Sequence, residues 1–560
     1  MKQIIECVPN FSEGRDLNVI KQITNEIETV DGVKLLDVDP GKATNRTVVT
    51  FVGEPEAAIE AAFLAIKKAS ELIDMSKHSG EHPRMGATDV CPLIPVANIS
   101  MEEVAEYAHK LGKRVGRELN IPGYFYESAA TKPERKNLAT VRAGEYEGME
   151  KKVQDPNWKP DFGPAKFNAK TGVTGISARD FLIAYNVNLN TTSTRRANSI
   201  AFDIRENGRV KRTGDPVTGE IVTDEKGNPV RIPGTLKGVK AIGWYIEEYG
   251  VCQISMNITD FKATPFHVAY EETFNKSLER GLRVTGSELV GLVPKSAMIE
   301  AGKYFLKKQE RSVGVSEEEL IKIAIRSMGL DELAPFDPKK KIIEYMLDEE
   351  SSNLVDMTVK AFADETASES PAPGGGSIAA YAGVLGASLG TMVANLSSHK
   401  RGWDDKWEYY SDWAEKGQDL KDQLLFLVDE DTQAFNKIME AFRLPNSNDA
   451  EKAERSEAIQ EATKYAIEIP FKVMEVSFNT FDMLEAMAKD GLKASISDAG
   501  VGALCILTAI KGAFLNVKIN LGGLKDQTFK TQILEKGNKM VAEAQKREAK
   551  ILEIVEAKIG

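Results

Sequence analysis

Cysteine and histidine are scarce in this sequence. Its 560 residues contain four cysteines and five histidines. The cysteines lie far apart and form no CxxC pair, which excludes a disulfide scaffold and gives no zinc-finger spacing. The N-terminal apolar run is too short and too interrupted for a signal peptide, so we expect a cytoplasmic protein.

The sequence also lacks a dense block of charge of one sign. It has 72 Lys and Arg against 84 Asp and Glu, which gives a formal net charge of −12. Because a duplex-binding protein normally concentrates basic residues on one surface, we expect no nucleic-acid partner. Hydrophobic residues at 42% and charged residues at 28% are typical of a soluble globular chain. Its length predicts about three to five folding units.

Long uncharged runs are rare, and one challenges the soluble interpretation. Residues 377–396 carry no charge over 20 positions, which is the length of a membrane helix. The run is dominated by Ala, Gly, Ser and Thr, and its small residues recur at helical spacing. This pattern favours a tightly packed helix in a soluble domain over the alternative of a membrane span. We therefore expect no membrane partner.

The first part of the chain alternates strand-like and helical segments. A helix is predicted over residues 55–73, which carry small and apolar residues at helical spacing. Gly and Pro in residues 209–234 indicate exposed hairpins, and a long loop is expected over 149–164. Strands are predicted at 4–8, 34–38, 47–52, 181–190 and 253–258. Strands mixed with helices in this way favour an α/β or α+β architecture.

Beyond about residue 338 the sequence is mostly helical. We expect long helices there, separated by short segments rich in Gly, Pro and charged residues. The predicted breaks are residues 371–376, 399–405, 443–449 and 488–497. A mixed α/β half is therefore expected to precede an all-α half.

The densest reactive cluster lies at residues 77–96. His78, Glu81 and His82 spell HxxEH, a zinc-binding pattern when it lies on a helix. Gly80 interrupts that helix, and Pro83 disfavours helical geometry at the preceding residue. We therefore expect no metal site. His82 remains either a loop-borne general acid or base, or a turn residue satisfied by the backbone.

Two further loop features are candidates for function. Asp39 lies at a strand end before a Gly-rich turn, where it is either functional or an ordinary turn residue. Gly374, Gly375, Gly376 and Ser377 precede the uncharged helix. These glycines either let a ligand approach the helix N-terminus or only provide a flexible entry.

A helical stripe carries one acidic residue. Asp431 falls among apolar residues at helical spacing, whereas Asp429 lies off the stripe and is expected to be solvated. An aspartate on a packed face has a raised pKa, which favours a catalytic role over a structural one. The apolar members of the predicted stripe are Leu424, Val428, Phe435, Ile438 and Phe442.

Nine sequence strings resemble known enzymes. ECVPNFSEGRD, LLDVDPG, TNRTVVTFVG, GEHPRMGATDVCPLIPV, VRAGEYEG and DFGP resemble glutamate formimidoyltransferases. APGGGS, LVDEDTQAF and NVKINL resemble formimidoyltetrahydrofolate cyclodeaminases. The strings occur in order along one chain, which is thereby identified as a member of the bifunctional formimidoyltransferase–cyclodeaminase family.

The resemblance implies a site for each activity. His82 matches the transferase acid or base, Asp39 an aspartate of the same site, and Asp431 the cyclodeaminase acid or base. Residues 374–377 are assigned to the cyclodeaminase site. The folate-contacting stretch corresponds to Gly163, Pro164, Ala165, Lys166, Phe167, Asn168, Ala169, Lys170, Thr171 and Gly172.

The resemblance also implies a multi-domain fold. Two α/β (α+β) subdomains, residues 1–180 and 181–330, would form the transferase, with folate bound between them. Residues 331–353 would be a linker and 354–560 an all-α cyclodeaminase domain. Residues 209–234 form an insertion longer than expected for the family, which would decorate the second subdomain and puts none of the catalytic residues in doubt.

The implied chemistry is the transfer of a formimidoyl group from N-formimidoyl-L-glutamate to N5 of tetrahydrofolate. Ring closure to 5,10-methenyltetrahydrofolate with loss of ammonia then follows, as part of histidine degradation. Tetrahydrofolate, which is often polyglutamylated, would be a co-substrate, and no metal is implied. A homo-oligomer such as a ring-like octamer would be the assembly. Two alternatives remain: a metal-dependent hydrolase built on His78 and His82, and a non-catalytic folate-binding or scaffold protein.

Overall fold

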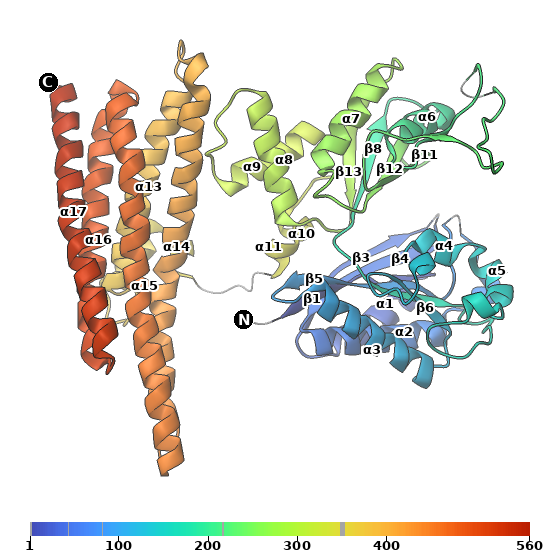
Figure 1. Ribbon diagram of the computed structural model, residues 1–560, viewed down its shortest axis with the longest axis horizontal. Coiled ribbons are helices and arrows are strands. Elements are labelled where there is room, and N and C mark those ends of the chain that lie inside the picture. The colour runs from blue at the N-terminus through green and yellow to red at the C-terminus, as the bar shows by residue number, and fades with distance from the viewer. Residues whose placement is uncertain (1–2, 43, 81, 216–217, 348–352) are drawn as a thin grey trace. The chain divides into compact units, whose positions relative to one another are not determined.

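The computed structural model describes residues 3–42, 44–80, 82–215, 218–347 and 353–560. Its contacts divide the chain into two compact units. The first contains residues 1–297 and 328–347, and the second contains residues 298–327 and 348–560 (Figure 1). The first unit mixes sheets and helices and the second is helical, which confirms the predicted fold class.

The N-terminal part of the first unit is built on a mixed sheet of seven strands. In spatial order β1, β4, β2, β5, β7 and β6 are neighbours, and β3 pairs with β4. The strands are β1 (Ile4–Cys7), β2 (Asn10–Phe11), β3 (Val33–Gly41), β4 (Arg46–Gly53), β5 (Thr88–Ala97), β6 (Gly123–Glu127) and β7 (Thr174–Ala178). The strands predicted at 4–8, 34–38 and 47–52 are thus confirmed.

Helices pack on one face of this sheet. They are α1 (Leu17–Glu28), α2 (Pro55–Leu72) and α3 (Met101–Glu118), and they form a common core with the strands (Figure 1). Val49 and Phe51 of β4 are fully buried in that core. Because side chains alternate along a strand, Arg46 and Val48 project from the opposite face. That opposite face carries the candidate transferase residues.

Residues 138–158 contain short helices. They are α4 (Leu138–Arg142), α5 (Glu145–Lys152) and a single 3-10 turn at Pro156–Trp158. The long loop expected over 149–164 is therefore wrong for residues 149–152, which belong to α5. The first turn of α5 carries acidic residues and its last turn carries lysines. This arrangement of charges stabilises a helix through its dipole, which explains why four residues of the expected loop are helical.

A second sheet follows in the first unit. Its four antiparallel strands have the order β11, β12, β8 and β13, and α6 (Thr194–Ile204) and α7 (Phe266–Leu278) pack on it (Figure 1). The strands are β8 (Ile183–Leu189), β11 (Val239–Ile246), β12 (Val251–Ile258) and β13 (Val284–Val290). The strands expected at 181–190 and 253–258 are confirmed.

The Gly- and Pro-rich segment 209–234 pairs with itself. β9 (Arg209–Val210) pairs with β10 (Arg231–Ile232), and single bridges join Arg212 to Ile221 and Thr223 to Pro229. The predicted hairpin character is confirmed for the described part, since residues 216 and 217 lie outside it.

Residues 338–347 return to the first unit. They form α10 (Pro338–Lys341) and α11 (Ile343–Leu347), and Ile343 packs with Leu36, Val52 and Leu292. Part of the stretch expected to be a linker is thus helical and contributes to a core. Residues 348–352 of that stretch lie outside the described residues.

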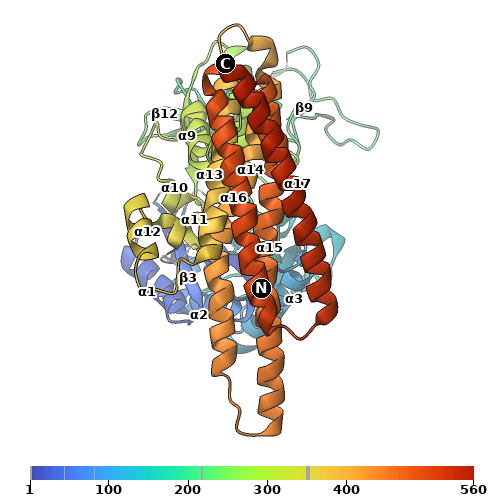
Figure 2. The same cartoon turned by 90° about the vertical axis from the view of Figure 1, so that its left-hand side faces the viewer.

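The second unit is all helical. Long helices lie side by side in it (Figure 2). Its helices are α8 (Lys295–Lys308, from Met298), α9 (Glu317–Met328, to Ser327), α12 (Val359–Thr366), α13 (Gly375–Ser398), α14 (Trp407–Arg443), α15 (Asp449–Asp490), α16 (Ile496–Asn520) and α17 (Gln527–Ile559). All four predicted breaks separate these helices, and a fifth at residues 521–526 was not predicted.

The uncharged segment forms the core helix α13. Two helices in the described residues are long and apolar enough to cross a membrane, Gly375–Ser398 and Lys493–Gly523, and 61% and 50% of their apolar windows are buried. Gly383, Gly386 and Gly390 lie on the packed side of α13, where a Cβ would come within 3 Å of Ser477, Ile506 and Met483 respectively. The small residues therefore permit close helix packing.

Candidate functional sites

The first candidate site is the loop that contains His82. It runs from the 3-10 turn Met75–Lys77 to β5, and no described residue of 78–87 is helical, as Gly80 and Pro83 predicted. His78 uses both ring nitrogens: Nε2 lies 2.9 Å from the Asn45 carbonyl, and Nδ1 accepts from Arg84 Nε at 3.4 Å. His78 therefore has no free lone pair for zinc.

Metal ligation gains no other support. Glu81, the acidic member of the HxxEH string, lies outside the described residues. Among the residues that are described, no group of three or more His, Cys, Asp or Glu side chains is arranged to hold a metal ion.

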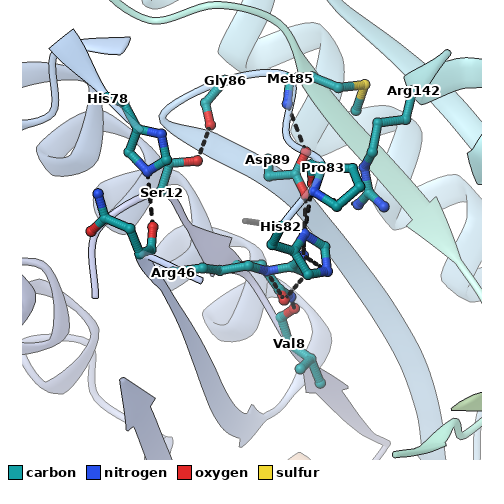
Figure 3. Close-up of polar contacts among 12 residues, drawn as sticks. Val8, Ser12, Arg46, His78, His82, Pro83, Met85, Gly86, Asp89 and Arg142 are labelled. Atoms are coloured by element: carbon teal, nitrogen blue, oxygen red, sulfur yellow. Dashed lines mark hydrogen bonds and ion pairs between the residues drawn. The ribbon is translucent and has the colours of Figure 1, made fainter. Parts of the chain in front are cut away.

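The His82 ring contacts the Arg46 side chain and the Pro83 backbone (Figure 3). Arg46 Nη1 lies 2.6 Å from Nδ1 and 2.7 Å from Nε2, and Nδ1 also lies 2.7 Å from the Pro83 carbonyl. Arginine can only donate, and a carbonyl can only accept. The tautomer with Nδ1–H satisfies the Pro83 carbonyl and leaves Nε2 as the ring's acceptor, and Arg46 Nη1 lies close to both ring nitrogens.

This environment keeps His82 neutral. Burial, and then the positive charges of Arg46 and Arg142, lower the pKa of its imidazole from 6.5 to about 4. At pH 7 the ring is therefore a neutral base whose conjugate acid gives up its proton readily.

Asp89 organises the groups around His82. It is fully buried, accepts a hydrogen bond from the Met85 amide at 2.9 Å, and pairs with Arg142 at 2.7 Å and Arg46 at 3.6 Å. In the register of β2 with β5, Asn10 faces Val90 and Phe11 faces Thr88, so Asp89 is the extra residue of a β-bulge. A bulge re-aims a side chain and is common beside active sites.

Arg46 is held in place from the neighbouring strand. Its Nε donates to Asn10 Oδ1 at 3.0 Å, and Nη2 contacts the same oxygen. Burial lowers the pKa of this guanidinium to about 10, so it remains a cation at neutral pH. His82, Asp89, Arg46 and Arg142 come from four separate segments and form one cluster.

The folate-contacting stretch of the resemblance, Gly163–Gly172, lies beside the His82 loop. The Ala87 amide donates to the Thr171 carbonyl at 2.8 Å, and the Val173 amide to the Met85 carbonyl at 3.0 Å. Gly172 has φ +67°, and a Cβ there would lie 2.2 Å from the Met85 carbonyl oxygen, so only glycine fits. Thr171 Oγ1 is buried with no hydrogen-bond partner among the described residues, which leaves a polar group available to a ligand.

Asp39 lies on the same face of the sheet but in other surroundings. Asp39 and Asn10 both pair with Val48, which puts their Cα atoms roughly 10 Å apart on the same face. Burial raises the pKa of Asp39, Asp37 and Glu288 raise it further, and Lys341 opposes them. None of these groups surrounds His82, so the structure brings the two residues to one face without joining them.

The second candidate site lies at the N-terminus of α13. Asp431 of α14 accepts a hydrogen bond from the Ser377 amide, and Ser377 Oγ, which donates to the Val428 carbonyl at 2.8 Å, also lies 3.3 Å from Asp431 Oδ2. The helix has no side-chain cap of its own at Gly374, so Asp431 caps it from a neighbouring helix. Burial raises the pKa of Asp431 against these two contacts with Ser377, which lower it.

Glycines make room for this contact. A Cβ at Gly376 would lie 2.1 Å from Asp431 Oδ1, and one at Gly375 would meet Asn516 Nδ2 at 3.4 Å. The structure therefore brings the predicted Gly375, Gly376, Ser377 and Asp431 together and adds Asn516 of α16. Asn516 lies in the NVKINL string, but reasoning from residue types did not select it.

Two expectations for α14 are wrong. Phe435 and Phe442 are 44% and 50% exposed, because the far parts of α14 and α15 extend beyond the other helices (Figure 2). Asp429 is not simply solvated, since it accepts a hydrogen bond from the Leu354 amide at 2.6 Å. The predicted burial holds for Leu424 and Val428, which are fully buried.

Comparison with known proteins agrees with this division into two sites. Models of the formiminotransferase domain match residues 4–179 (N-terminal subdomain) and 184–348, and the formiminotransferase-cyclodeaminase model matches 358–539. The formimidoyltransferase-cyclodeaminase of Gallus gallus is 43% identical over 99% of both chains. The chain belongs to the formimidoyltransferase-cyclodeaminase family.

A shorter protein resembles the first half of this family member. The glutamate formimidoyltransferase of Thermoplasma acidophilum is 42% identical over 54% of this chain and 92% of its own length. A crystal structure of formiminotetrahydrofolate cyclodeaminase from Thermotoga maritima covers 37% of this chain and 98% of its own, with 27% identity and a TM-score of 0.33.

The motifs of the formimidoyltransferase-cyclodeaminase family contain the residues that reasoning from residue types missed. Arg46 lies in TNRTVVTFVG, Asp89 in GATDVCPLIPV and Arg142 in VRAGEYEG. Each is an ordinary charged residue when taken alone. Only the folded chain shows that the three meet at His82.

Proposed function

We propose that His82 and Asp431 carry the two chemical steps of this bifunctional folate enzyme. The enzyme transfers the formimidoyl group of N-formimidoyl-L-glutamate to N5 of tetrahydrofolate, its co-substrate. It then cyclises 5-formimidoyltetrahydrofolate to 5,10-methenyltetrahydrofolate and releases ammonia, a sequence that belongs to histidine degradation.

In the transfer step, N5 attacks the amidine carbon and must lose a proton. Neutral His82 accepts that proton at Nε2, while Nδ1–H stays bound to the Pro83 carbonyl. The imidazolium then donates the proton to the departing amine of glutamate. The observation that carries this proposal is the buried, neutral imidazole with one nitrogen fixed by the backbone. Arg46 contacts the imidazole ring, and Asp89 pairs with Arg46.

In the ring closure, N10 attacks the formimidoyl carbon and gives up its proton, and the departing nitrogen takes up a proton to leave as ammonia. The raised pKa of Asp431 favours the protonated acid, which donates to the departing nitrogen. Ser377 positions the carboxyl group, and Gly376 leaves space around it. The product carbon is then part of a five-membered ring.

Further properties follow from exposed features. Lys166 and Lys170 supply exposed cations in the folate-contacting stretch, which favours a polyglutamylated folate. Leu385 and Leu396 of α13 and Leu515 and Ile519 of α16 are 44% to 75% exposed, which supports a homo-oligomer such as a ring-like octamer. Cys7 and Cys91 have sulfur atoms 3.6 Å apart, and the reducing cytoplasm that we propose for this protein would keep both thiols reduced.

One experiment tests the function. The protein is mixed with N-formimidoyl-L-glutamate and tetrahydrofolate, and the absorbance of the methenyl product and the release of ammonia are followed together. Both should rise in equal amounts and be unaffected by a chelator. A chelator-sensitive hydrolysis, or folate binding without the methenyl product, would contradict the proposal.

A further inference from the structure

Among the described residues, which do not include Glu81, the charges around His82 do not balance. Arg46 and Arg142 share one carboxylate, that of Asp89, which leaves one positive charge in excess. The three side chains are 14%, 15% and 0% exposed, so water screens this charge poorly.

A third arginine nearby does not contribute to the excess. Arg84 is 11% exposed, but it pairs with Glu145 at 3.3 Å and Glu147 at 2.7 Å. Its charge is therefore neutralised within the protein. The imbalance belongs to Arg46 and Arg142.

Arg142 also has an unused donor. Its Nη2 donates to Asp89 Oδ2, whereas its Nε is buried with no hydrogen-bond partner among the described residues. A buried donor without a partner costs about 1–3 kcal/mol, so a ligand that accepts from it is stabilised. Excess positive charge beside a free guanidinium edge is suited to a carboxylate.

We propose that Arg142, together with Arg46, binds the α-carboxylate of N-formimidoyl-L-glutamate and so selects this substrate. The inference rests on the proposed transferase function. In the substrate, the α-carboxylate and the nitrogen that carries the formimidoyl group are attached to the same carbon. A carboxylate held beside His82 therefore places the reacting group at the ring. The γ-carboxylate lies further along the side chain and is free to reach another part of the site.

Binding of the carboxylate also changes the state of His82. In the structure Arg46 Nη1 lies 2.7 Å from Nε2, the nitrogen that must accept the proton. The α-carboxylate competes for this donor and frees Nε2. It also offsets the field of Arg46 and Arg142, which Asp89 offsets only in part, so the pKa of His82 rises when substrate is bound.

The kinetic test compares carboxylate and carboxamide substrates. Transfer is measured with N-formimidoyl-L-glutamate, with its α-carboxamide (N-formimidoyl-isoglutamine) and with its γ-carboxamide (N-formimidoyl-glutamine). Wild type should prefer the α-carboxylate over the α-carboxamide by roughly 10- to 100-fold in kcat/KM. Arg142→Met should lose that preference through a higher KM, and Arg142→Lys should retain part of it.

Controls separate this inference from a folding defect. Arg84→Met removes an arginine of similar burial that is already neutralised, and it should leave the preference for the α-carboxylate intact. The KM of Arg142→Met for tetrahydrofolate and its cyclisation of supplied 5-formimidoyltetrahydrofolate should stay near wild type. Retention of the full α-carboxylate preference by Arg142→Met would overturn the inference.

A binding measurement gives a readout that does not need turnover. L-Glutamate, the product of transfer, is added while the ring nitrogens of His82 are titrated by NMR in the full chain. The pKa of His82 should rise with L-glutamate and with its γ-amide glutamine, and should not rise with the α-amide isoglutamine. An equal rise with isoglutamine would contradict the inference. Absence of any transfer by wild type would instead contradict the proposed function.

Discussion

The carboxylate of Asp431 occupies the space that a side chain at Gly376 would fill. A Cβ there would lie 2.1 Å from Oδ1 and 2.5 Å from Oδ2. Gly376→Ala is therefore expected to displace the carboxylate and to lower the cyclisation rate by roughly 100-fold, the effect of a misplacement of about 1 Å. Transfer should persist, so 5-formimidoyltetrahydrofolate should accumulate.

The control for this substitution is Gly522→Ala, because a Cβ at Gly522 meets no atom within 4 Å. It should cyclise at the wild-type rate. Normal cyclisation by Gly376→Ala would show that the Asp431 carboxylate is not needed at this position. Absorbance of the methenyl product gives the rate.

Substitutions of Asp431 separate catalysis from capping. Asp431→Asn keeps an oxygen that accepts from Ser377 but removes the acid, so cyclisation should fall by roughly 100- to 10,000-fold while the fold persists. Asp431→Leu also removes the cap of α13 and should destabilise the helical unit by about 1–2 kcal/mol. The two are distinguished by chemical denaturation. A stable Asp431→Leu would mean that the cap contributes little.

His82→Ala should lose transfer by roughly 100- to 10,000-fold and still cyclise supplied 5-formimidoyltetrahydrofolate. In wild type the ring should titrate near pH 4 in NMR, since its pKa lies below the value of 6.5 in the unfolded chain. The stabilisation from its neutral form is present above pH 6.5 and is lost as the pH falls through 4. Titration near 6.5 in the free protein would contradict the buried geometry.

The ionisation of Glu6 makes the stability of the fold depend on pH in the opposite sense to that of His82. Burial raises its pKa from 4.5 to about 7, although Arg179 opposes the shift, and the residue is only 4% exposed. The folded protein therefore holds a proton that the unfolded chain releases, so stability falls by about 3 kcal/mol as the pH rises from 4.5 through 7. Glu6→Gln should remove this loss.

The stability of Glu6→Gln is best measured by hydrogen exchange of β1 along a urea series at pH 5 and pH 8.5. The variant should resemble wild type at pH 5 and exceed it at pH 8.5. Glu28→Gln, an exposed carboxylate, is the control and should not alter the pH dependence. Equal stability of Glu6→Gln and wild type at pH 8.5 would show that ionisation of Glu6 does not destabilise the folded protein.

The end point of a transferase fragment should matter. Ile343 is 2% exposed and packs with Leu36, Val52 and Leu292, and its amide donates to the Val293 carbonyl. A fragment of residues 1–347 should fold and transfer without cyclising. A fragment of 1–335 loses this packing and should be less stable by about 2–5 kcal/mol or more, as thermal unfolding would show. Equal stability would mean that residues 336–347 are dispensable.

The helices of the second unit could be predicted well because their ends carry local signals. Proline, glycine and charged clusters mark the breaks before α13, α14, α15 and α16, and the structure has all four. The extent of burial could not be predicted in the same way. The apolar spacing continues past Asp431 to Phe435 and Phe442, but spacing does not reveal how far the neighbouring helices reach.

The candidate sites show a similar limit. His82 was evident because an imidazole in a loop bounded by glycine and proline is unusual. Asp89 was not, since its position depends on a bulge between two strands that are distant in sequence. Arg142, which completes the cluster around His82, comes from the short helix α4, whose sequence shows no regular apolar spacing. Contacts between distant segments leave no periodic trace in the sequence.

The bulge at Asp89 also determines where the chain tolerates a change of length. β5 pairs with β1 on one edge and with β7 on the other, so it cannot slide to absorb a missing residue. Deletion of Asp89 would remove the bulge and the carboxylate that pairs with Arg46 and Arg142, and it would alter how the His82 loop enters β5. Insertions and deletions among relatives should therefore be excluded between His82 and Val90, and a reliable alignment has no gap there.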